Sequence, residues 1–199
     1  MNKQGKEKLR KLLIGAMLTA IGIMIPMYMP VRVIIPPASF TLASHVPVMM
    51  AMFFSPAMAF LVAIGTTFGF VLAGFPVTIW LRAFSHVVFV LIGAYYLKKR
   101  PNIVNQKVGF QVFNVVIALI HSLAETGIVF AFYALGFAHM DRAALFNLLL
   151  LIGLGGIVHS VVDMNIAFVL SKSLNRVFSI EVFDRAKEIF AKKKNVKLV

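Results

Sequence analysis

Apolar stretches about twenty residues long recur along almost the whole chain and leave no polar segment long enough to build a soluble core. A helix of about 20 apolar residues crosses the hydrocarbon core of a lipid bilayer. Hydrophobic residues make up 60% of the 199 residues and charged residues only 14%, which is far from the composition of soluble domains. The sequence therefore predicts one all-α integral membrane domain over residues 1–199.

Six transmembrane helices in a compact bundle are expected, separated by breaks at proline and glycine, such as the loop PVRVIIPPASF with Pro30, Pro36 and Pro37. The expected spans are about 9–29, 41–54, 57–75, 77–97, 108–137 and 143–174. A polar linker, KKRPNIVNQK, precedes the fifth span. Residues 175–199 are expected as a polar tail with an amphipathic helical pattern at Val182, Phe183, Ala186, Ile189 and Phe190.

The basic residues that give the chain its net charge of +13 lie mostly on one side of the predicted membrane spans. With six spans, the 20 lysine and arginine residues fall on one side except for Arg32, Arg82 and Arg142. Cytoplasmic loops carry an excess of basic residues, so both termini are expected in the cytoplasm. The basic charge is thus interpreted as a topology signal, and no nucleic-acid partner is predicted.

Ionisable side chains inside the spans are the candidate functional residues, because such groups are costly in hydrocarbon and usually face a cavity or a partner. Three pairs lie one helical turn apart: Arg82 with His86, His121 with Glu125, and His159 with Asp163. His45, near the outer end of the second span, is a further candidate. The two pairs that contain a carboxylate could instead be self-contained contacts that hold helices together.

Arg82 differs because its neighbour one turn later is a histidine rather than a carboxylate. It is expected about one turn below the outer surface, where a guanidinium could bind a carboxylate ligand through two hydrogen bonds. Alternatively, the side chain could reach up to the outer headgroups. Trp80 and Tyr28 are expected near the same interface, either in an aromatic belt or stacked on a flat ligand ring.

Motifs for several other functions are missing from the sequence. There is no P-loop, GxxxxGK[ST], so the chain cannot hydrolyse ATP by itself, and no HExxH or nucleophile–base motif points to an enzyme. A zinc or nickel site is an alternative interpretation of His45, His86, His121 and His159. Because these histidines lie on different spans without a local ligand motif, no metal or cofactor is predicted. A proton relay in a self-sufficient carrier also stays open.

Small residues gather in the first span, in the segment GAMLTAIG, where Gly15, Ala16, Thr19 and Ala20 let another helix approach closely. That helix could belong to the chain itself or to a partner. Together with six spans, cytoplasmic termini and the proline-containing loop, this pattern resembles the S components of energy-coupling factor (ECF) vitamin transporters. The segments TLASHVPVMMAMFFSP, GTTFGFVLAGFP and LRAFSHVVFVLIGAYYLKK resemble most closely the niacin-specific branch.

The resemblance implies a multi-pass subunit of a bacterial plasma membrane that captures a vitamin, most closely niacin, in an outward-facing pocket. It further implies docking through Gly15, Ala16, Thr19 and Ala20 onto a transmembrane scaffold protein that works with two ATPase subunits. The expected substrate-binding residues are Arg82, His86, Trp80, His45, Glu125, His121 and Tyr28. Another vitamin such as pantothenate, or a stand-alone proton-coupled carrier, remains an alternative.

Overall fold

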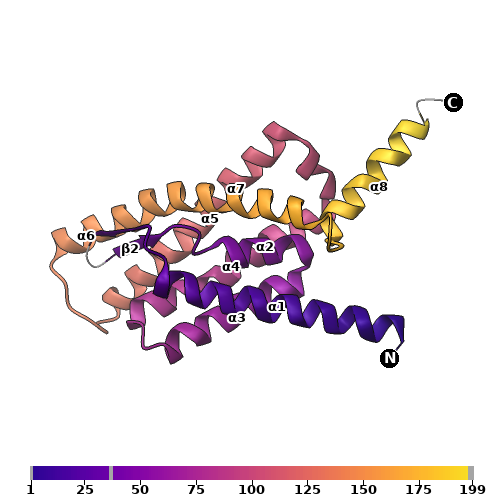
Figure 1. The fold of residues 1–199 in the computed structure, drawn as a ribbon. Helices are drawn as coiled ribbons and strands as arrows, with labels where there is room; N and C mark the ends of the chain where they lie inside the picture. Colours follow the sequence, from indigo (N-terminus) through magenta and orange to yellow (C-terminus); the bar gives the residue numbers. More distant parts are fainter. Residues whose placement is uncertain (1, 36–37, 197–199) are drawn as a thin grey trace.

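The computed structural model describes residues 2–35 and 38–196. Most of its long helices lie along one bundle, and α8 runs obliquely away from one end of it (Figure 1). The predicted breaks at Pro36 and Pro37 lie outside the described residues. The elements, in chain order, are α1 (Lys3–Tyr28), β1 (Arg32–Ile35), β2 (Ala38–Thr41), α2 (Val46–Phe54), α3 (Pro56–Leu72), α4 (Val77–Lys99), the 3₁₀ helix η1 (Pro101–Asn105), α5 (Lys107–Ala134), α6 (Arg142–Leu150), the π-helical turn η2 (Leu151–Gly155), α7 (Gly156–Leu174) and α8 (Glu181–Val196).

Four helical stretches among the described residues are long and apolar enough to cross a membrane: Gln4–Tyr28, Val77–Lys99, Lys107–Ala134 and Arg142–Leu174. The apolar helix Pro56–Leu72 is shorter. The last long stretch continues through α6, η2 and α7, so the π turn interrupts its hydrogen-bond pattern without ending it. The prediction of a helical, multi-pass membrane protein is confirmed.

The second predicted span, residues 41–54, is wrong as a continuous helix. Its helical part, α2, has nine residues, which at about 1.5 Å per residue cover less than half of the hydrocarbon core. Before α2 the chain forms β2 and a turn in which Ala43 has a φ of 65°. All nine α2 residues are buried inside the bundle. High hydropathy here reflects burial against other helices rather than contact with lipid.

A hydrophobic core surrounds α2 and continues to the C-terminal helix. The ring of Phe53 stacks against Phe110 of α5 and Phe183 of α8, with centroid distances of 6.4 and 5.3 Å. Of the predicted amphipathic pattern of the tail, Val182, Phe183 and Ala186 are buried in α8, whereas Phe190, which was expected on the same face, is exposed. The linker predicted to be polar instead contributes Ile103 and Val104 to this core.

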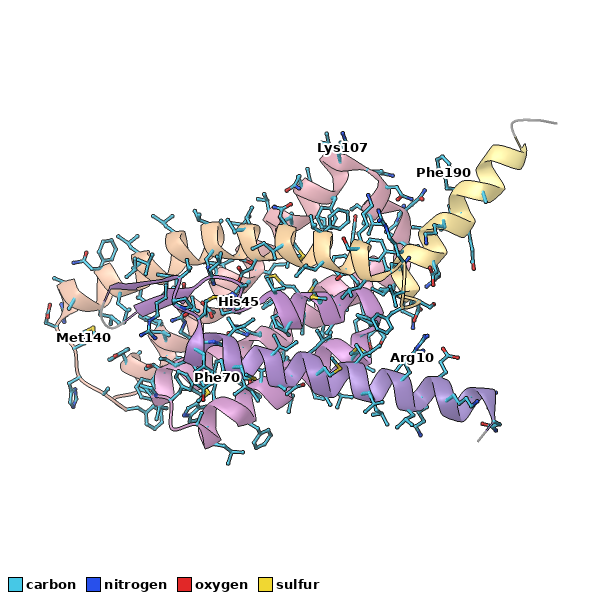
Figure 2. The ribbon with its side chains drawn as sticks, viewed as in Figure 1. Arg10, His45, Phe70, Lys107, Met140 and Phe190 are labelled. Carbon is cyan, nitrogen blue, oxygen red and sulfur yellow. The ribbon has the colours of Figure 1, made fainter. Side chains whose placement is uncertain are left out.

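The two ends of the bundle differ in what they carry. Arg10, Lys107 and Phe190 lie toward one end, whereas Met140 lies at the other (Figure 2). The antiparallel hairpin of β1 and β2, in which Arg32 pairs with Thr41, lies near the Met140 end (Figure 1). His45 lies inside the bundle between the two ends (Figure 2). Because α2 is short and buried, the residue at its N-cap, His45, lies inside the apolar bundle.

Candidate functional site

A cavity of about 330 Å³ lies between the hairpin, the bend before α2, and the helices α1, α3, α4, α5 and α7. Its size is typical of a pocket for one small molecule. Three phenylalanine rings, those of Phe40, Phe70 and Phe75, contribute aromatic surface. The polar groups of its lining come from Arg32, Thr41, Ser44, His45, Thr66, Arg82, His86, Glu125 and His159.

Arg82 and Glu125 form an ion pair within the wall of this cavity. Nη2 of Arg82 donates a hydrogen bond to Oε2 of Glu125 at 3.0 Å, and both side chains are largely removed from the surface. The Nε of Arg82 is buried and has no hydrogen-bond partner among the described residues. The guanidinium is thus neutralised by a protein carboxylate yet keeps a donor that is not satisfied.

Glu125 also contacts two histidines through its second oxygen. Its Oε1 lies 3.1 Å from Nε2 of His86 on α4 and 3.5 Å from Nε2 of His121, one turn earlier on α5. The predicted His121–Glu125 pair therefore exists, but its contact is longer than those that link Glu125 to Arg82 and His86. Glu125 thus contacts His121 within its own helix and also connects α5 to α4 through shorter contacts.

Asp163 of α7 caps the N-terminus of α2. Its two carboxylate oxygens accept hydrogen bonds from the backbone N–H groups of Ala43 and His45, at 2.9 and 3.0 Å. Nδ1 of His45 lies 3.1 Å from Oδ2, and Nε2 of His159 lies 3.3 Å from the same oxygen. A carboxylate is stabilised at this position because the first N–H groups of a helix are unpaired and its dipole is positive there.

Four histidines come together beside the cavity. The ring of His45 lies 4.5 Å from that of His121 and 4.8 Å from those of His86 and His159, measured between centroids. One ligand atom from each of His45, His86, His121 and Glu125 lies within 4.8 Å of the others, a spacing that a metal ion could close. His45, His159 and Asp163 form a second group of this kind.

The structure brings together most of the residues predicted from the sequence to bind the substrate. Arg82, His86, His45 and Glu125 line the cavity, and His121 lies fully buried behind them. Trp80 and Tyr28 are not among the residues that line it, and Tyr28 is 70% exposed. The aromatic surface of the cavity comes from phenylalanines instead.

Several residues of the cavity were not singled out from the sequence. Arg32 and Phe40 come from the hairpin, whose residues follow no helical period, so no spacing pattern could have placed them. Ser44 lies 3.0 Å from His159 across the cavity wall. One signal did exist, since the tripeptide SHV occurs at Ser44–Val46 and again at Ser85–Val87, and both of its histidines line the cavity.

The small residues of α1 divide between two environments. Gly15, Thr19 and Gly22 face α3, where a Cβ atom added to Gly65 would lie 2.7 Å from Cγ2 of Thr19. Ala16 and Ala20 are exposed instead. A groove of about 550 Å³, lined by Gly15, Ala16 and Thr19 among others, runs between α1 and the start of α3. Of the predicted docking face, Gly15 and Thr19 thus pack toward α3, whereas Ala16 and Ala20 remain exposed on the surface.

Long apolar helices around an internal cavity that is lined by both apolar and polar residues define a multi-pass helical membrane protein. The chain is 55% identical over 194 residues to the niacin transporter NiaX of Lactococcus lactis subsp. cremoris (strain MG1363), an alignment that covers 98% of this chain and 87% of the relative. The chain belongs to this niacin transporter family. The predictions of a transporter rather than an enzyme, and of a likeness to the niacin branch, are therefore confirmed.

Neither of the other comparisons adds to this assignment. No family model matches the chain. No solved structure matches it either.

Proposed function

We propose that the chain is the substrate-binding S component of an ECF importer and that it captures niacin, as the nicotinate anion, from outside the cell. The observation that carries this proposal is the cavity of about 330 Å³, whose lining includes Arg32 and Arg82 together with three phenylalanines. Nicotinate is a flat aromatic ring with one carboxylate, so it needs the two kinds of surface that this cavity offers. The identity to a niacin transporter supports the same substrate.

In the proposed complex, the carboxylate of nicotinate is bound by Arg82 and Arg32, which both line the cavity. The pyridine ring packs against Phe40, Phe70 and Phe75, and its nitrogen is bound by His86 or His45. Glu125 and His121 act from behind by holding Arg82 and His86 in place. We assign Trp80 and Tyr28 to the membrane interface, because neither lines the cavity.

The proposed topology has six membrane passes within one integral domain over residues 1–199, with both termini in the cytoplasm. The second pass consists of the hairpin, the bend and α2, and the sixth consists of α6, η2 and α7. The proposed topology puts the N-terminal segment, the start of α5 and the C-terminal helix on the same side of the membrane. Arg10, Lys107 and Phe190 of these segments do lie toward one end of the bundle, and Met140 lies at the other end (Figure 2), which supports the topology. So does the charge bias, because basic residues concentrate on the cytoplasmic side. The cavity and the hairpin then lie toward the outside.

The proposed partners are a transmembrane scaffold protein and two ATPase subunits. The sequence contains no P-loop, so energy from ATP must come from another chain. We propose that the scaffold docks on the exposed side of the small-residue stripe, at Ala16 and Ala20, next to Gly15 and Thr19. An exposed stripe of this kind allows two helices to approach closely within a membrane.

Ligand titration of the purified chain in detergent tests the substrate. Nicotinate should bind more tightly than nicotinamide by about tenfold or more, because hydrogen bonds to a charged group contribute about 1.5–3 kcal/mol. Pantothenate, which lacks an aromatic ring, should not bind. Equal affinity for nicotinate and nicotinamide would overturn the role of the two arginines.

Reconstitution of the lone chain in lipid vesicles tests the importer class. The chain should bind nicotinate but should not accumulate it when a proton gradient is imposed. Gradient-driven accumulation would instead support the stand-alone carrier. Adding the scaffold and the two ATPase subunits should restore uptake that depends on ATP.

A further inference from the structure

Three imidazole rings and one carboxylate converge on a common point beside the cavity. His45 comes from the start of α2, His86 from α4, and His121 and Glu125 from α5. The centroids of the three rings lie 4.5, 4.8 and 4.9 Å apart, and all four side chains are buried. Imidazole and carboxylate groups in this combination are the ligands that zinc and related ions take in proteins.

The spacing of the ligand atoms matches what a tetrahedral ion requires. Bonds of about 2.0–2.1 Å to nitrogen or oxygen place two ligand atoms about 3.3–3.4 Å apart around a tetrahedral centre. Oε1 of Glu125 lies 3.1 Å from Nε2 of His86 and 3.5 Å from Nε2 of His121. These two distances lie on either side of the required value, and all four ligand atoms lie within 4.8 Å of one another, so the side chains must move closer together to accept an ion.

His121 contributes a nitrogen that is only weakly satisfied within the cluster. Its side chain is fully buried, and its Nε2 forms no hydrogen bond of good geometry among the described residues, although Oε1 of Glu125 lies 3.5 Å away. Its other nitrogen, Nδ1, lies 3.1 Å from Oγ of Ser160. When Nδ1 carries the hydrogen and donates it to Ser160, Nε2 presents a lone pair toward the cluster, and a buried unpaired acceptor is costly unless something binds it.

His45 has the supporting contact that metal-bound histidines usually have. Its Nδ1 lies 3.1 Å from Oδ2 of Asp163, which leaves its Nε2 as the nitrogen available to an ion. A carboxylate that accepts a hydrogen bond from the second ring nitrogen fixes the tautomer and strengthens the histidine as a ligand. Asp163 itself already accepts hydrogen bonds from Ala43 and His45, so it suits this supporting role better than direct coordination.

We propose that His45, His86, His121 and Glu125 form a binding site for a divalent first-row transition-metal ion of the zinc type. The ion can reach the site through the cavity, since His45, His86 and Glu125 all line it. Arg82 keeps Oε2 of Glu125 while Oε1 turns to the ion. Glu125 and Asp163 together with Arg82 carry one net negative charge, so a divalent ion leaves one positive charge, which favours an anion in the cavity. When the ion is bound, His45 and His86 act as its ligands and not as partners of the pyridine nitrogen. The metal site does not depend on the identity of the anion.

Cobalt spectroscopy on the purified full-length chain tests this site directly. The protein carries an affinity tag without histidine, is stripped with a chelator, and is titrated with Co²⁺, whose visible absorption is strong in tetrahedral sites. One Co²⁺ per chain should bind and give this spectrum, and Zn²⁺ should displace it. No Co²⁺ spectrum and no Zn²⁺ binding in the wild-type chain would overturn the proposal.

Two variants and a matched control locate the ion. His121→Gln should weaken Zn²⁺ binding by at least about tenfold, and Ser160→Ala, which keeps all four ligands, should weaken it by about tenfold or more. His139→Gln should bind Zn²⁺ like the wild type, because His139 is exposed in the loop before α6. If His121→Gln does not fold, the Ser160→Ala result decides the question. Unchanged affinity in Ser160→Ala or in a folded His121→Gln chain would contradict the assignment. Nicotinate titration is a separate measurement, so either proposal can fail alone.

Discussion

Arg82 of α4 donates a hydrogen bond to Glu125 of α5 at 3.0 Å, and this ion pair forms part of the wall of the internal cavity. The two residues are 43 positions apart in the chain. A buried cation that is paired with a protein carboxylate can stay in the membrane before any ligand arrives. The pair therefore explains how the binding site remains stable when empty, and it makes the contribution of Arg82 to folding separable from its contribution to binding.

Replacing both members of this pair should remove binding while preserving the fold. Arg82→Ala alone removes the arginine from Oε2 of Glu125 and leaves this buried carboxylate with only its contacts to His86 and His121, which costs up to about 3–5 kcal/mol, so it should lower both thermal stability and nicotinate affinity. The double variant Arg82→Gln/Glu125→Gln replaces two charges with neutral amides, and it should unfold close to the wild-type temperature. Its affinity for nicotinate should fall at least about tenfold. Calorimetric titration and thermal unfolding measure the two effects.

A matched control for this experiment is Arg142→Gln, because Arg142 is exposed at the start of α6. It should bind nicotinate with wild-type affinity. A stable double variant that still binds nicotinate as tightly as the wild type would remove Arg82 from the site.

Asp163 should matter more for stability than an ordinary helix cap. Asp163→Ala removes hydrogen bonds to the backbone of Ala43 and His45 inside the bundle, and unpaired buried donors are expensive. We expect a loss of at least about 3 kcal/mol from these charge-assisted bonds. Asp141→Ala removes the exposed cap of α6 and should cost only about 1 kcal/mol. Thermal unfolding in detergent compares the two, and equal losses would show that α2 does not need its buried cap.

The contact between α1 and α3 depends on glycine. A methyl group added at Gly69 would overlap Cδ1 and Cγ1 of Ile23, whereas one added at Gly127 meets nothing nearby. Gly69→Ala should therefore destabilise the chain by about 1–3 kcal/mol through overpacking. Gly127→Ala should be neutral or stabilising by up to about 1 kcal/mol, since alanine favours helix. The double variant Gly69→Ala/Ile23→Ala should be more stable than Gly69→Ala alone, because the overlap with the Ile23 side chain is removed. If it is not more stable, the overlap with Ile23 is not the cause of the lost stability.

The exposed side of α1 should be needed for uptake but not for binding. Ala16→Trp or Ala20→Trp adds a large ring to the proposed docking stripe, which would keep a partner helix from approaching. Niacin uptake by cells should be lost, while the purified chain should bind nicotinate normally. Val158→Trp places the same ring on the exposed surface of α7 and should leave uptake intact. Normal uptake by both α1 variants would count against this docking face.

Helical periodicity reports which residues share a face, and several of the predicted polar residues do lie together in the structure. Arg82 and His86 are one turn apart, and both line the cavity. His121 and Glu125 are likewise on one face of α5, and both are buried. Local spacing could not show that Glu125 makes its shorter contacts with α4, since those contacts join residues about 40 positions apart. The ion pair between Arg82 and Glu125 could therefore not be predicted from spacing within one helix.

The second predicted span shows the limit of hydropathy. A run of apolar residues indicates that a segment avoids water, but lipid and a protein core are equally dry. In this chain the run from Thr41 to Phe54 combines the end of β2, a turn and a nine-residue helix surrounded by other helices. Only the packed structure distinguishes these elements from one transmembrane helix.

The amino-acid sequence by itself determined that this chain is a helical membrane protein, because a backbone in lipid must satisfy its own hydrogen bonds and long apolar helices do so locally. It also determined which faces of those helices are polar. The tertiary structure alone decided that Asp163 caps α2, that Phe40 of the hairpin lines the cavity, and that four histidines meet beside it. These contacts join distant segments, and their geometry depends on how the helices pack rather than on any local spacing of residues.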